Sequence, residues 1–263
     1  MDLQQLLGSS QALPSIPKVI ALILAELNEE DPDLIKVSSL LAQEPVLAAR
    51  LLKMANSAKF ELAHQISNIP EALAVVGFRD IRALVCAEAV RSAFRQVGGI
   101  DLREFWQYSR ETARLSRKLI SNNRLSVTAF TAGLIHATGE LVMHLGMPEE
   151  MQQLNNRMSV FSLQRAETER ELFGFSYAQV GAGLARAWSF PGVLVEMFDH
   201  HDAPFTRGNY EPLSGVVHLA AWSARAKELG YCDADLVETF PDEVAMALNL
   251  DMDKVLERDG AGP

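Results

Sequence analysis

The hydrophobic residues of this 263-residue chain recur at helical spacing along most of its length. Val19, Leu22 and Leu27, for example, fall on one face of a helix. No segment bounded by turns alternates apolar and polar residues as a half-buried strand would. Apolar residues make up 48% of the chain and charged residues 22%, which is enough apolar material for a packed core. The sequence therefore predicts an all-α fold.

Periodicity and cap residues predict where the helices lie. Pro14 and Pro17 are predicted to open the ordered part of the chain, and Asn68 with Glu71 has the pattern of a capping box. Residues 128–145 are predicted to form the most buried helix. The main predicted helices cover residues 19–27, 35–41, 45–56, 68–77, 80–94, 101–121, 128–145, 161–173, 177–187, 191–200 and 213–229, with shorter ones from Pro148, Pro241 and Asp251.

The pair Gly98-Gly99 is the clearest hinge signal in the chain. We take it as the boundary between two helical lobes, which predicts a two-lobed helical bundle. The predicted domains are an N-terminal helical lobe over residues 1–97, a second helical lobe over residues 98–229, and an acidic C-terminal helical extension or tail over residues 230–263.

The net charge of −10 is concentrated at one end of the chain. Residues 228–263 hold 10 acidic and 2 basic side chains, whereas the preceding residues are close to neutral. A near-neutral body gives no electrostatic argument for nucleic-acid binding. The N-terminus has neither a basic segment nor a long apolar one, and residues 128–147 contain two histidines and a glutamate. We therefore expect a cytoplasmic protein without a membrane span.

Three polar residues, His136, Glu140 and His144, are spaced four apart in the predicted helix over residues 128–145. This spacing places them on one drifting stripe of a helix. We interpret them as buried groups that satisfy neighbouring backbone or each other, because buried polar groups usually find partners. The alternative is a ligand set or an acid–base pair.

Several stretches, taken in order, resemble one family of helical proteins, the HDOD family. The most specific is Leu51-Leu52-Lys53-Met54-Ala55-Asn56-Ser57-Ala58. The others are Leu13–Pro17, Ile66–Gly77, the Gly133–Gly139 segment around His136, and Trp188–Pro191 before His200-His201. The resemblance covers about residues 13–222 and implies a degenerate relative of the HD phosphohydrolases, with a regulatory rather than an established enzymatic role.

Active HD enzymes bind metal through an early histidine, a His-Asp pair, further histidines and a late aspartate. By resemblance, His136 and the pair His200-His201 keep ligand positions. The other positions are changed: Tyr108 falls where the early histidine would be, Ala137 replaces the paired aspartate, Tyr177 falls where a third histidine often lies, and Ala221 falls where the late aspartate would be.

These changes remove the anionic ligands of such a metal centre. Neutral imidazoles alone bind hard or borderline cations weakly, and a phenol is a poor substitute ligand at neutral pH. Without a metal, no bound water is acidified to attack a phosphate. We therefore expect no catalytic residue, no metal and no cofactor, and a core plugged by Tyr108 and Tyr177. A weak Zn²⁺ or Ni²⁺ site and a small-ligand site are the alternatives.

The sequence thus favours a non-enzymatic signal-transduction regulator or scaffold with a protein partner of unknown identity, linked by resemblance to two-component or cyclic-dinucleotide signalling. One alternative is a metal-dependent phosphohydrolase that acts on nucleotides with unconventional ligands. A second is a DNA-binding regulator, in which Arg79 and Arg82 would lie near the start of a recognition helix. Such a helix normally carries more basic and amide groups than this one.

Overall fold

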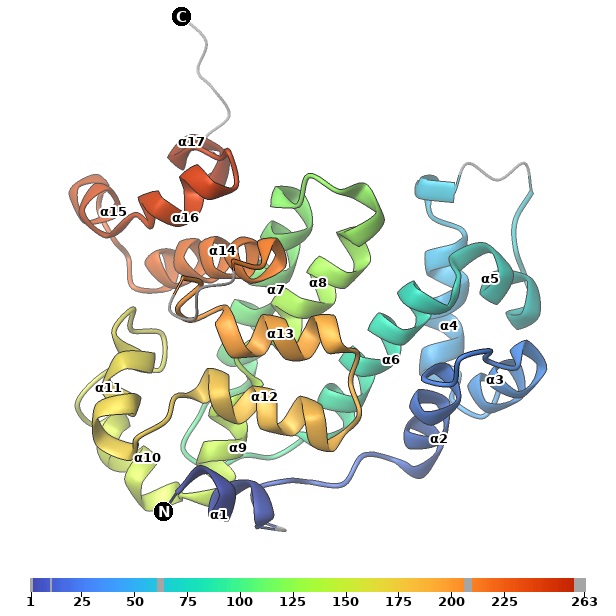
Figure 1. Ribbon diagram of the computed structural model, residues 1–263, viewed down its shortest axis with the longest axis horizontal. Coiled ribbons are helices and arrows are strands. Elements are labelled where there is room, and N and C mark those ends of the chain that lie inside the picture. Colours follow the sequence, from blue (N-terminus) through green and yellow to red (C-terminus); the bar gives the residue numbers. More distant parts are fainter. Residues whose placement is uncertain (1, 10, 61–63, 206–209, 258–263) are drawn as a thin grey trace, which may run out of the picture. The chain divides into compact units, whose positions relative to one another are not determined.

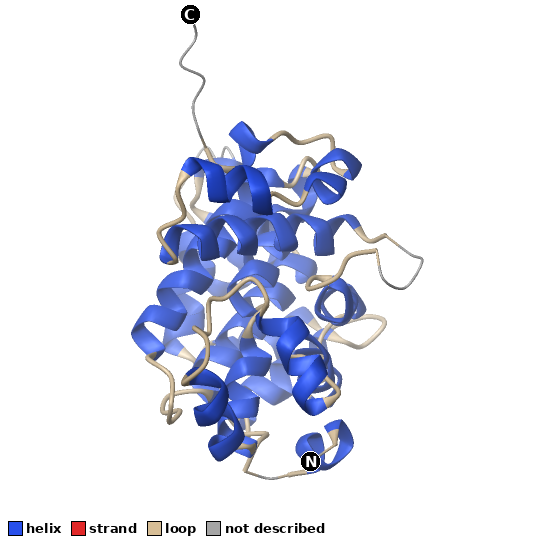
Figure 2. Ribbon diagram, turned by 90° about the vertical axis from the view of Figure 1, so that its left-hand side faces the viewer, coloured by secondary structure: helices blue, strands red, loops and turns tan. Residues whose placement is uncertain are grey.

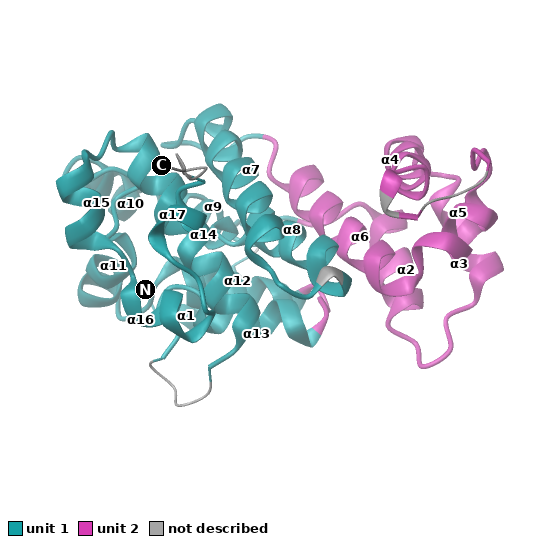
Figure 3. Ribbon diagram, turned by 90° about the horizontal axis from the view of Figure 1, so that it is seen from above, with its two compact units in different colours: residues 1–14, 96–187, 192–263 teal, residues 15–95, 188–191 magenta. Residues whose placement is uncertain are grey.

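The computed structural model describes residues 2–9, 11–60, 64–205 and 210–257. Every regular element in these residues is a helix and none is a strand, which confirms the predicted all-α class (Figure 2). The chain divides into two compact units (Figure 3). Unit 1 comprises residues 1–14, 96–187 and 192–263, and unit 2 comprises residues 15–95 and 188–191. The three predicted domains stay a prediction.

Unit 2 is a small bundle in which α2 packs against α3 and α6, and α4 packs against α5. The Asn68 side chain caps α5 by accepting a hydrogen bond from the Glu71 backbone at 2.9 Å, as predicted, whereas the Glu71 carboxylate accepts from the Asn68 side-chain amide and not from its backbone. Gly77 then turns the chain from α5 into α6 with a φ of 81°, a conformation that favours glycine. The elements are α2 (Lys18–Leu27), α3 (Leu34–Leu41), α4 (Pro45–Ala55), η1 (Ala58–Phe60), α5 (Ile69–Val76) and α6 (Phe78–Ala93).

Unit 1 contains the remaining helices (Figure 3), and Figure 1 labels its α-helices. Two of its α-helices were not predicted: α1 (Leu3–Gly8), which precedes the expected start of the ordered part, and α15 (Asp233–Thr239). The others are α7 (Leu102–Leu119), η2 (Asn123–Leu125), α8 (Ser126–Ile135), α9 (Thr138–Gly146), α10 (Pro148–Asn155), α11 (Arg165–Phe173), α12 (Tyr177–Ala187), α13 (Gly192–His200), α14 (Pro212–Glu228), α16 (Asp242–Ala247) and α17 (Met252–Val255).

The predicted single helix over residues 128–145 is wrong, because the chain breaks it into α8 and α9. His136 and Ala137 form the junction between the two helices. The Thr138 hydroxyl donates a hydrogen bond to the Ile135 carbonyl at the end of α8, which partly replaces the lost helical bonding. His136 is therefore not on one continuous stripe with the polar residues of α9.

Glycines allow α12 to lie very close to its neighbours. A Cβ added at Gly139 of α9 would lie 1.8 Å from the Tyr177 carbonyl oxygen, and one added at Gly181 would lie 2.5 Å from the Phe198 ring. A Cβ at Gly183 would lie 2.3 Å from Leu7. Gly181 and Gly183 therefore allow close packing of α12 against its neighbours. These contacts fix α12 against α9 and α13, which carry or adjoin the predicted site residues.

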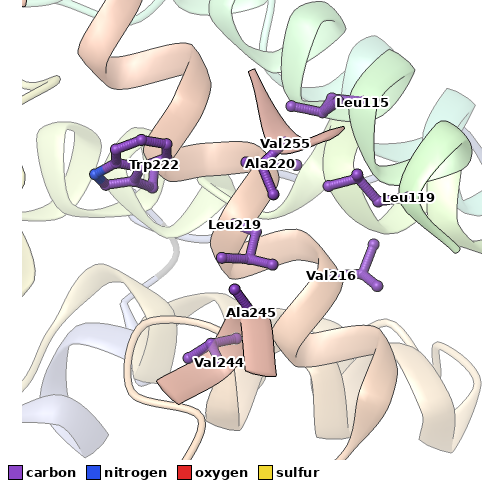
Figure 4. Close-up of a cluster of buried hydrophobic side chains, with 9 residues drawn as sticks. All are labelled: Leu115, Leu119, Val216, Leu219, Ala220, Trp222, Val244, Ala245 and Val255. Carbon is purple, nitrogen blue, oxygen red and sulfur yellow. The ribbon is translucent and has the colours of Figure 1, made fainter. Parts of the chain in front are cut away.

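The acidic C-terminal segment is helical and packs on unit 1 as far as residue 257, so it is not a free tail over the described residues. Its buried residues join a hydrophobic cluster with α7 and α14 (Figure 4). Glu257 accepts hydrogen bonds from Arg114 at 2.6 Å and Lys118 at 3.0 Å, which fastens the end of the segment to α7. The cluster comprises Leu115, Leu119, Val216, Leu219, Ala220, Trp222, Val244, Ala245 and Val255.

In the part of the chain that the structure describes, no helix combines the length and the apolar character that crossing a bilayer requires.

Candidate functional site

Four of the seven predicted site residues lie together in the core of unit 1. Tyr108 comes from α7, His136 from the α8–α9 junction, Tyr177 from the start of α12, and His201 from the residue that follows α13. The His136 and His201 rings lie 5.5 Å apart between centroids, and the Tyr177 and His201 rings lie 5.6 Å apart. All four side chains are buried, with 2% exposure or less. These residues form the tyrosine–histidine cluster.

The imidazole of His136 is hydrogen bonded through both nitrogens. Its Nδ1 lies 2.7 Å from the carbonyl oxygen of Gly133, and its Nε2 lies 2.7 Å from the hydroxyl of Tyr108. A carbonyl oxygen can only accept, so Nδ1 carries the proton and Nε2 accepts from the tyrosine hydroxyl. The Nε2 lone pair of His136, which could otherwise bind a metal ion, is therefore already used.

The imidazole of His201 is held in the same tautomer. Its Nδ1 lies 3.2 Å from the carbonyl oxygens of both Met197 and Phe198, so Nδ1 is the donor and Nε2 the acceptor. The Nε2 atom is buried and has no hydrogen-bond partner within the described residues. His201 thus presents an open lone pair inside the core, next to Tyr177 and His136.

The cluster has a fifth member that the sequence analysis did not identify, Arg225 of α14. Its Nε donates to the Tyr108 hydroxyl at 3.0 Å and its Nη2 donates to the Tyr177 hydroxyl at 3.1 Å. Its Nη1 donates to the Ser162 carbonyl oxygen at 3.3 Å. The guanidinium also lies over both tyrosine rings, 5.8 Å from the Tyr108 centroid and 5.4 Å from that of Tyr177. Arg225 therefore links the two tyrosines by donating a hydrogen bond to each.

Burial sets the charge states in this cluster. It lowers the pKa of His136 well below its ordinary value and that of His201 to about 4, so both imidazoles are neutral at pH 7. Burial also raises the pKa of Tyr108 and Tyr177, which keeps both phenols protonated. Against the effect of burial, the two phenols raise the pKa of Arg225, so its guanidinium remains charged. The cluster therefore contains one fixed positive charge among neutral rings.

The other three predicted site residues are not among the four whose rings form the cluster. His200 is on the last turn of α13, and its Nδ1 hydrogen bonds to the carbonyl oxygen of Glu196 on the same helix at 2.9 Å. Ala137 is buried at the α8–α9 junction, and Ala221 is buried on α14 one turn before Arg225. Only one histidine of the predicted pair is thus part of the cluster, and the two alanines contribute no polar atom to it.

A second buried network surrounds Arg165, which has no solvent exposure. Its Nε donates to Glu140 and Glu169, each at 3.0 Å, and its Nη2 donates to Asn155 at 2.9 Å. Burial opposes ionisation of Glu140, but the positive charge of Arg165 holds its pKa below the ordinary value. Burial and the nearby Glu140 charge raise the pKa of Glu169 well above its usual range. This network connects to the cluster because Glu169 accepts from the Tyr177 backbone at 2.7 Å.

Glu140 and His144, the two polar residues of the predicted stripe that lie on α9, have hydrogen-bond partners within this network. Glu140 pairs with Arg165, and Nδ1 of His144 donates to the Glu140 carbonyl oxygen at 2.7 Å. Nε2 of His144 lies 3.0 Å from Asn155. The interpretation of these residues as buried groups with local partners is confirmed, although the helix that was expected to carry all of them is interrupted at His136.

The side chains present do not fit a divalent metal centre. Within residues 2–9, 11–60, 64–205 and 210–257, no three His, Cys, Asp or Glu side chains gather in a way that could hold a metal ion. The nearest acidic neighbour of His201 in sequence, Asp202, is bonded to Arg170 at 2.5 Å and to Ser176 at 2.8 Å. The fixed cation and the hydroxyl on His136 Nε2 both oppose a metal ion at this place.

Sequence reasoning missed Arg225, Arg165 and Glu169. Arg225 is flanked by Ala224 and Ala226 on a helix with many small residues, and a charged residue in such a run was the available signal. Arg165 and Glu169 are spaced four apart on α11, which is also the spacing of an ordinary exposed pair. Burial of both residues could not be read from that spacing.

Comparison with known proteins gives matches over most of the chain. Residues 13–204 match the model of the HDOD domain family. An uncharacterized protein of Treponema pallidum is 24% identical over 217 residues, which cover 81% of this chain and 42% of the relative. The chain thus spans less than half the length of that curated relative.

Solved structures include similar chains. A proposed phosphohydrolase from Shewanella amazonensis is 30% identical with a TM-score of 0.73, and the match covers 97% of this chain and 92% of that one. An HDOD domain protein of unknown function from Geobacter sulfurreducens is 24% identical with a TM-score of 0.67, and the match covers 98% and 94% of the two chains. At this lower identity the likeness shows the fold alone.

Proposed function

This chain belongs to the HDOD domain family, and we propose that it is a non-enzymatic regulator or scaffold in bacterial signal transduction that acts through protein–protein contacts. The family is generally regarded as a degenerate branch of the HD phosphohydrolases.

One observation carries the non-enzymatic part of the proposal: the Tyr108 hydroxyl is hydrogen bonded to Nε2 of His136 at 2.7 Å. A hydrolase of this class would need that lone pair for a metal ion and a carboxylate nearby to offset the charge. The acidic side chains Glu140 and Asp202 are instead paired with Arg165 and Arg170. The residues that could support phosphate hydrolysis are therefore engaged in holding the core.

The name of the Shewanella amazonensis relative, a proposed phosphohydrolase, favours a second candidate function, phosphohydrolase activity. The two candidates separate in a turnover assay of the purified chain with nucleotides and bis-p-nitrophenyl phosphate in Mn²⁺, Ni²⁺ or Zn²⁺. We expect no hydrolysis above that of the His136→Ala variant. Turnover that is lost in both His136→Ala and His201→Ala would establish the hydrolase and end the non-enzymatic proposal.

The regulatory part of the proposal needs an exposed surface, and the acidic C-terminal extension supplies one. Val237 on α15 and Met246 on α16 are 66% and 74% exposed, and both lie among acidic residues. Exposed apolar side chains within a charged rim are typical of protein-binding surfaces. We expect a partner recovered by affinity purification to be lost with Val237→Asp and Met246→Asp and retained with Glu238→Gln. A partner set that is unchanged by both apolar substitutions would exclude this surface.

DNA binding receives little support from the geometry of unit 2. Arg82 donates to the Leu27 carbonyl at the end of α2, so its guanidinium serves the packing of two helices. Arg79 is 55% exposed but lies 3.4 Å from Asp80. A mobility-shift assay in which Arg79→Ala weakens a measurable complex would revive this alternative.

A further inference from the structure

We propose that Arg225 is a built-in cation that keeps a divalent metal ion away from the imidazoles of His136 and His201, and that removing its charge allows a metal ion to bind there. The inference concerns metal exclusion and does not depend on any partner. Its basis is the geometry of the tyrosine–histidine cluster together with Arg225.

Both imidazoles have the form that ligates metals through Nε2. In His136 and His201 the Nδ1 proton is held by backbone carbonyl oxygens, of Gly133 in the first case and of Met197 and Phe198 in the second. Such outer contacts fix the tautomer and orientation of metal-binding histidines and leave Nε2 as the free ligand. The two rings are 5.5 Å apart, each buried.

The open lone pair of His201 is the second observation. Its Nε2 is buried without a hydrogen-bond partner in the described residues, which is costly for a polar atom. A core that served only packing would be more stable with a hydrogen-bond donor opposite this nitrogen. The unpartnered Nε2 of His201, with the His136 ring beside it, is therefore consistent with a metal-ligand position from which the metal ion is excluded.

Arg225 opposes binding of a metal ion in two ways. Its positive charge is buried, and within the described residues no carboxylate forms an ion pair with it, so it repels a second cation at short range. It also orients Tyr108: because the phenol oxygen accepts from Arg225 Nε, its own proton points to Nε2 of His136. The charge of Arg225 therefore opposes a second cation at the open Nε2 of His201, and the Tyr108 hydroxyl that Arg225 orients occupies Nε2 of His136.

The test compares two substitutions at the same position in the full chain. Arg225→Gln removes the charge and keeps a polar side chain, whereas Arg225→Lys keeps the charge. Each metal-free protein is titrated with Co²⁺ and Ni²⁺, with circular dichroism to confirm the fold. We expect Arg225→Gln to bind one ion per chain at least tenfold more tightly than the wild type or Arg225→Lys, and His201→Ala in the Arg225→Gln background to abolish the gain.

Equal affinities in the folded Gln and Lys variants, or a gain that survives His201→Ala, would overturn the inference. Tyr108→Phe keeps the proposal testable if Arg225 variants do not fold. This variant frees Nε2 of His136 but retains the charge of Arg225, so we expect no gain in metal affinity. Stoichiometric Co²⁺ binding by Tyr108→Phe would show that the hydroxyl alone excludes the metal. Because metal binding is measured rather than turnover or partners, failure here would leave the regulatory proposal standing.

Discussion

The hydroxyl of Tyr108 lies 2.7 Å from Nε2 of His136, so the imidazole nitrogen that could bind a metal ion is already hydrogen bonded. The contact joins α7 to the α8–α9 junction, two places 28 residues apart in the chain. Arg225 of α14 donates to the same phenol oxygen. One tyrosine thus ties three elements together and determines what the adjacent histidine can do.

Removing this hydroxyl tests its structural role. Tyr108→Phe leaves His136 Nε2 and one N–H of Arg225 buried without partners, and unsatisfied buried polar groups cost about 1–3 kcal/mol each in the free energy of unfolding. We expect a loss of about 2 kcal/mol or more in urea denaturation, against less than about 0.5 kcal/mol for the control Tyr231→Phe, whose side chain is half-buried. A Tyr108→Phe protein as stable as the wild type would show that the hydrogen bonds contribute nothing net.

We expect a larger loss of stability when the buried network around Arg165 is disrupted. Arg165→Met leaves Glu140 and Glu169 facing each other without their shared cation, and breaking a buried pair in this way costs about 3–5 kcal/mol. The matched control is Arg114→Met, which also removes an arginine with two carboxylate partners, but at the surface, where such pairs contribute about 0–1 kcal/mol. If Arg165→Met and Arg114→Met lower the free energy of unfolding by similar amounts in urea denaturation, the expected difference between buried and surface ion pairs is wrong.

Acid should destabilise the fold through the buried histidines. The pKa of His201 is about 4 in the folded chain, mainly because of burial, and about 6.5 when unfolded. Between these values the unfolded chain binds a proton that the folded chain does not. The stability that His201 contributes is therefore complete above pH 6.5 and is lost as the pH falls toward 4, by up to about 3 kcal/mol.

Urea denaturation between pH 7.5 and pH 4.5 measures this effect. We expect the free energy of unfolding to fall less steeply with acid in His201→Gln than in the wild type. Glu257, whose hydrogen bond with Arg114 lowers its pKa to about 2, titrates in both proteins and cancels in the comparison. Parallel pH profiles for the two proteins would mean that His201 does not carry the acid sensitivity.

The C-terminal extension is predicted to be part of the folded core. Val255 of α17 is fully buried in the cluster with α7 and α14 (Figure 4). Val237 of α15, in contrast, is 66% exposed. Val255→Asp places a charge in this cluster and should lower the free energy of unfolding by about 2–4 kcal/mol. Val237→Asp should change it by less than about 0.5 kcal/mol. If Val255→Asp and Val237→Asp have the same free energy of unfolding, packing of the C-terminal extension on α7 and α14 does not stabilise the fold.

The sequence predicted the fold class and most helices, because their apolar faces and caps are local signals. It failed at the α8–α9 junction, where the apolar run continues through His136 and Ala137 although the helix stops. It also could not choose between His200 and His201. Successive residues of a helix point about 100° apart, so only one of two neighbours can face a given cluster. Arg225 was missed because its partners come from helices distant in the chain.

The central claim is that the imidazoles of His136 and His201 serve a metal-free core. Elemental analysis tests it most directly: the purified full chain is incubated with Mn²⁺, Fe²⁺, Ni²⁺ and Zn²⁺, dialysed, and measured beside His136→Ala and His201→Ala. We predict well below one metal ion per chain and no difference among the three proteins. One metal ion per wild-type chain that is lost in both variants would contradict the account.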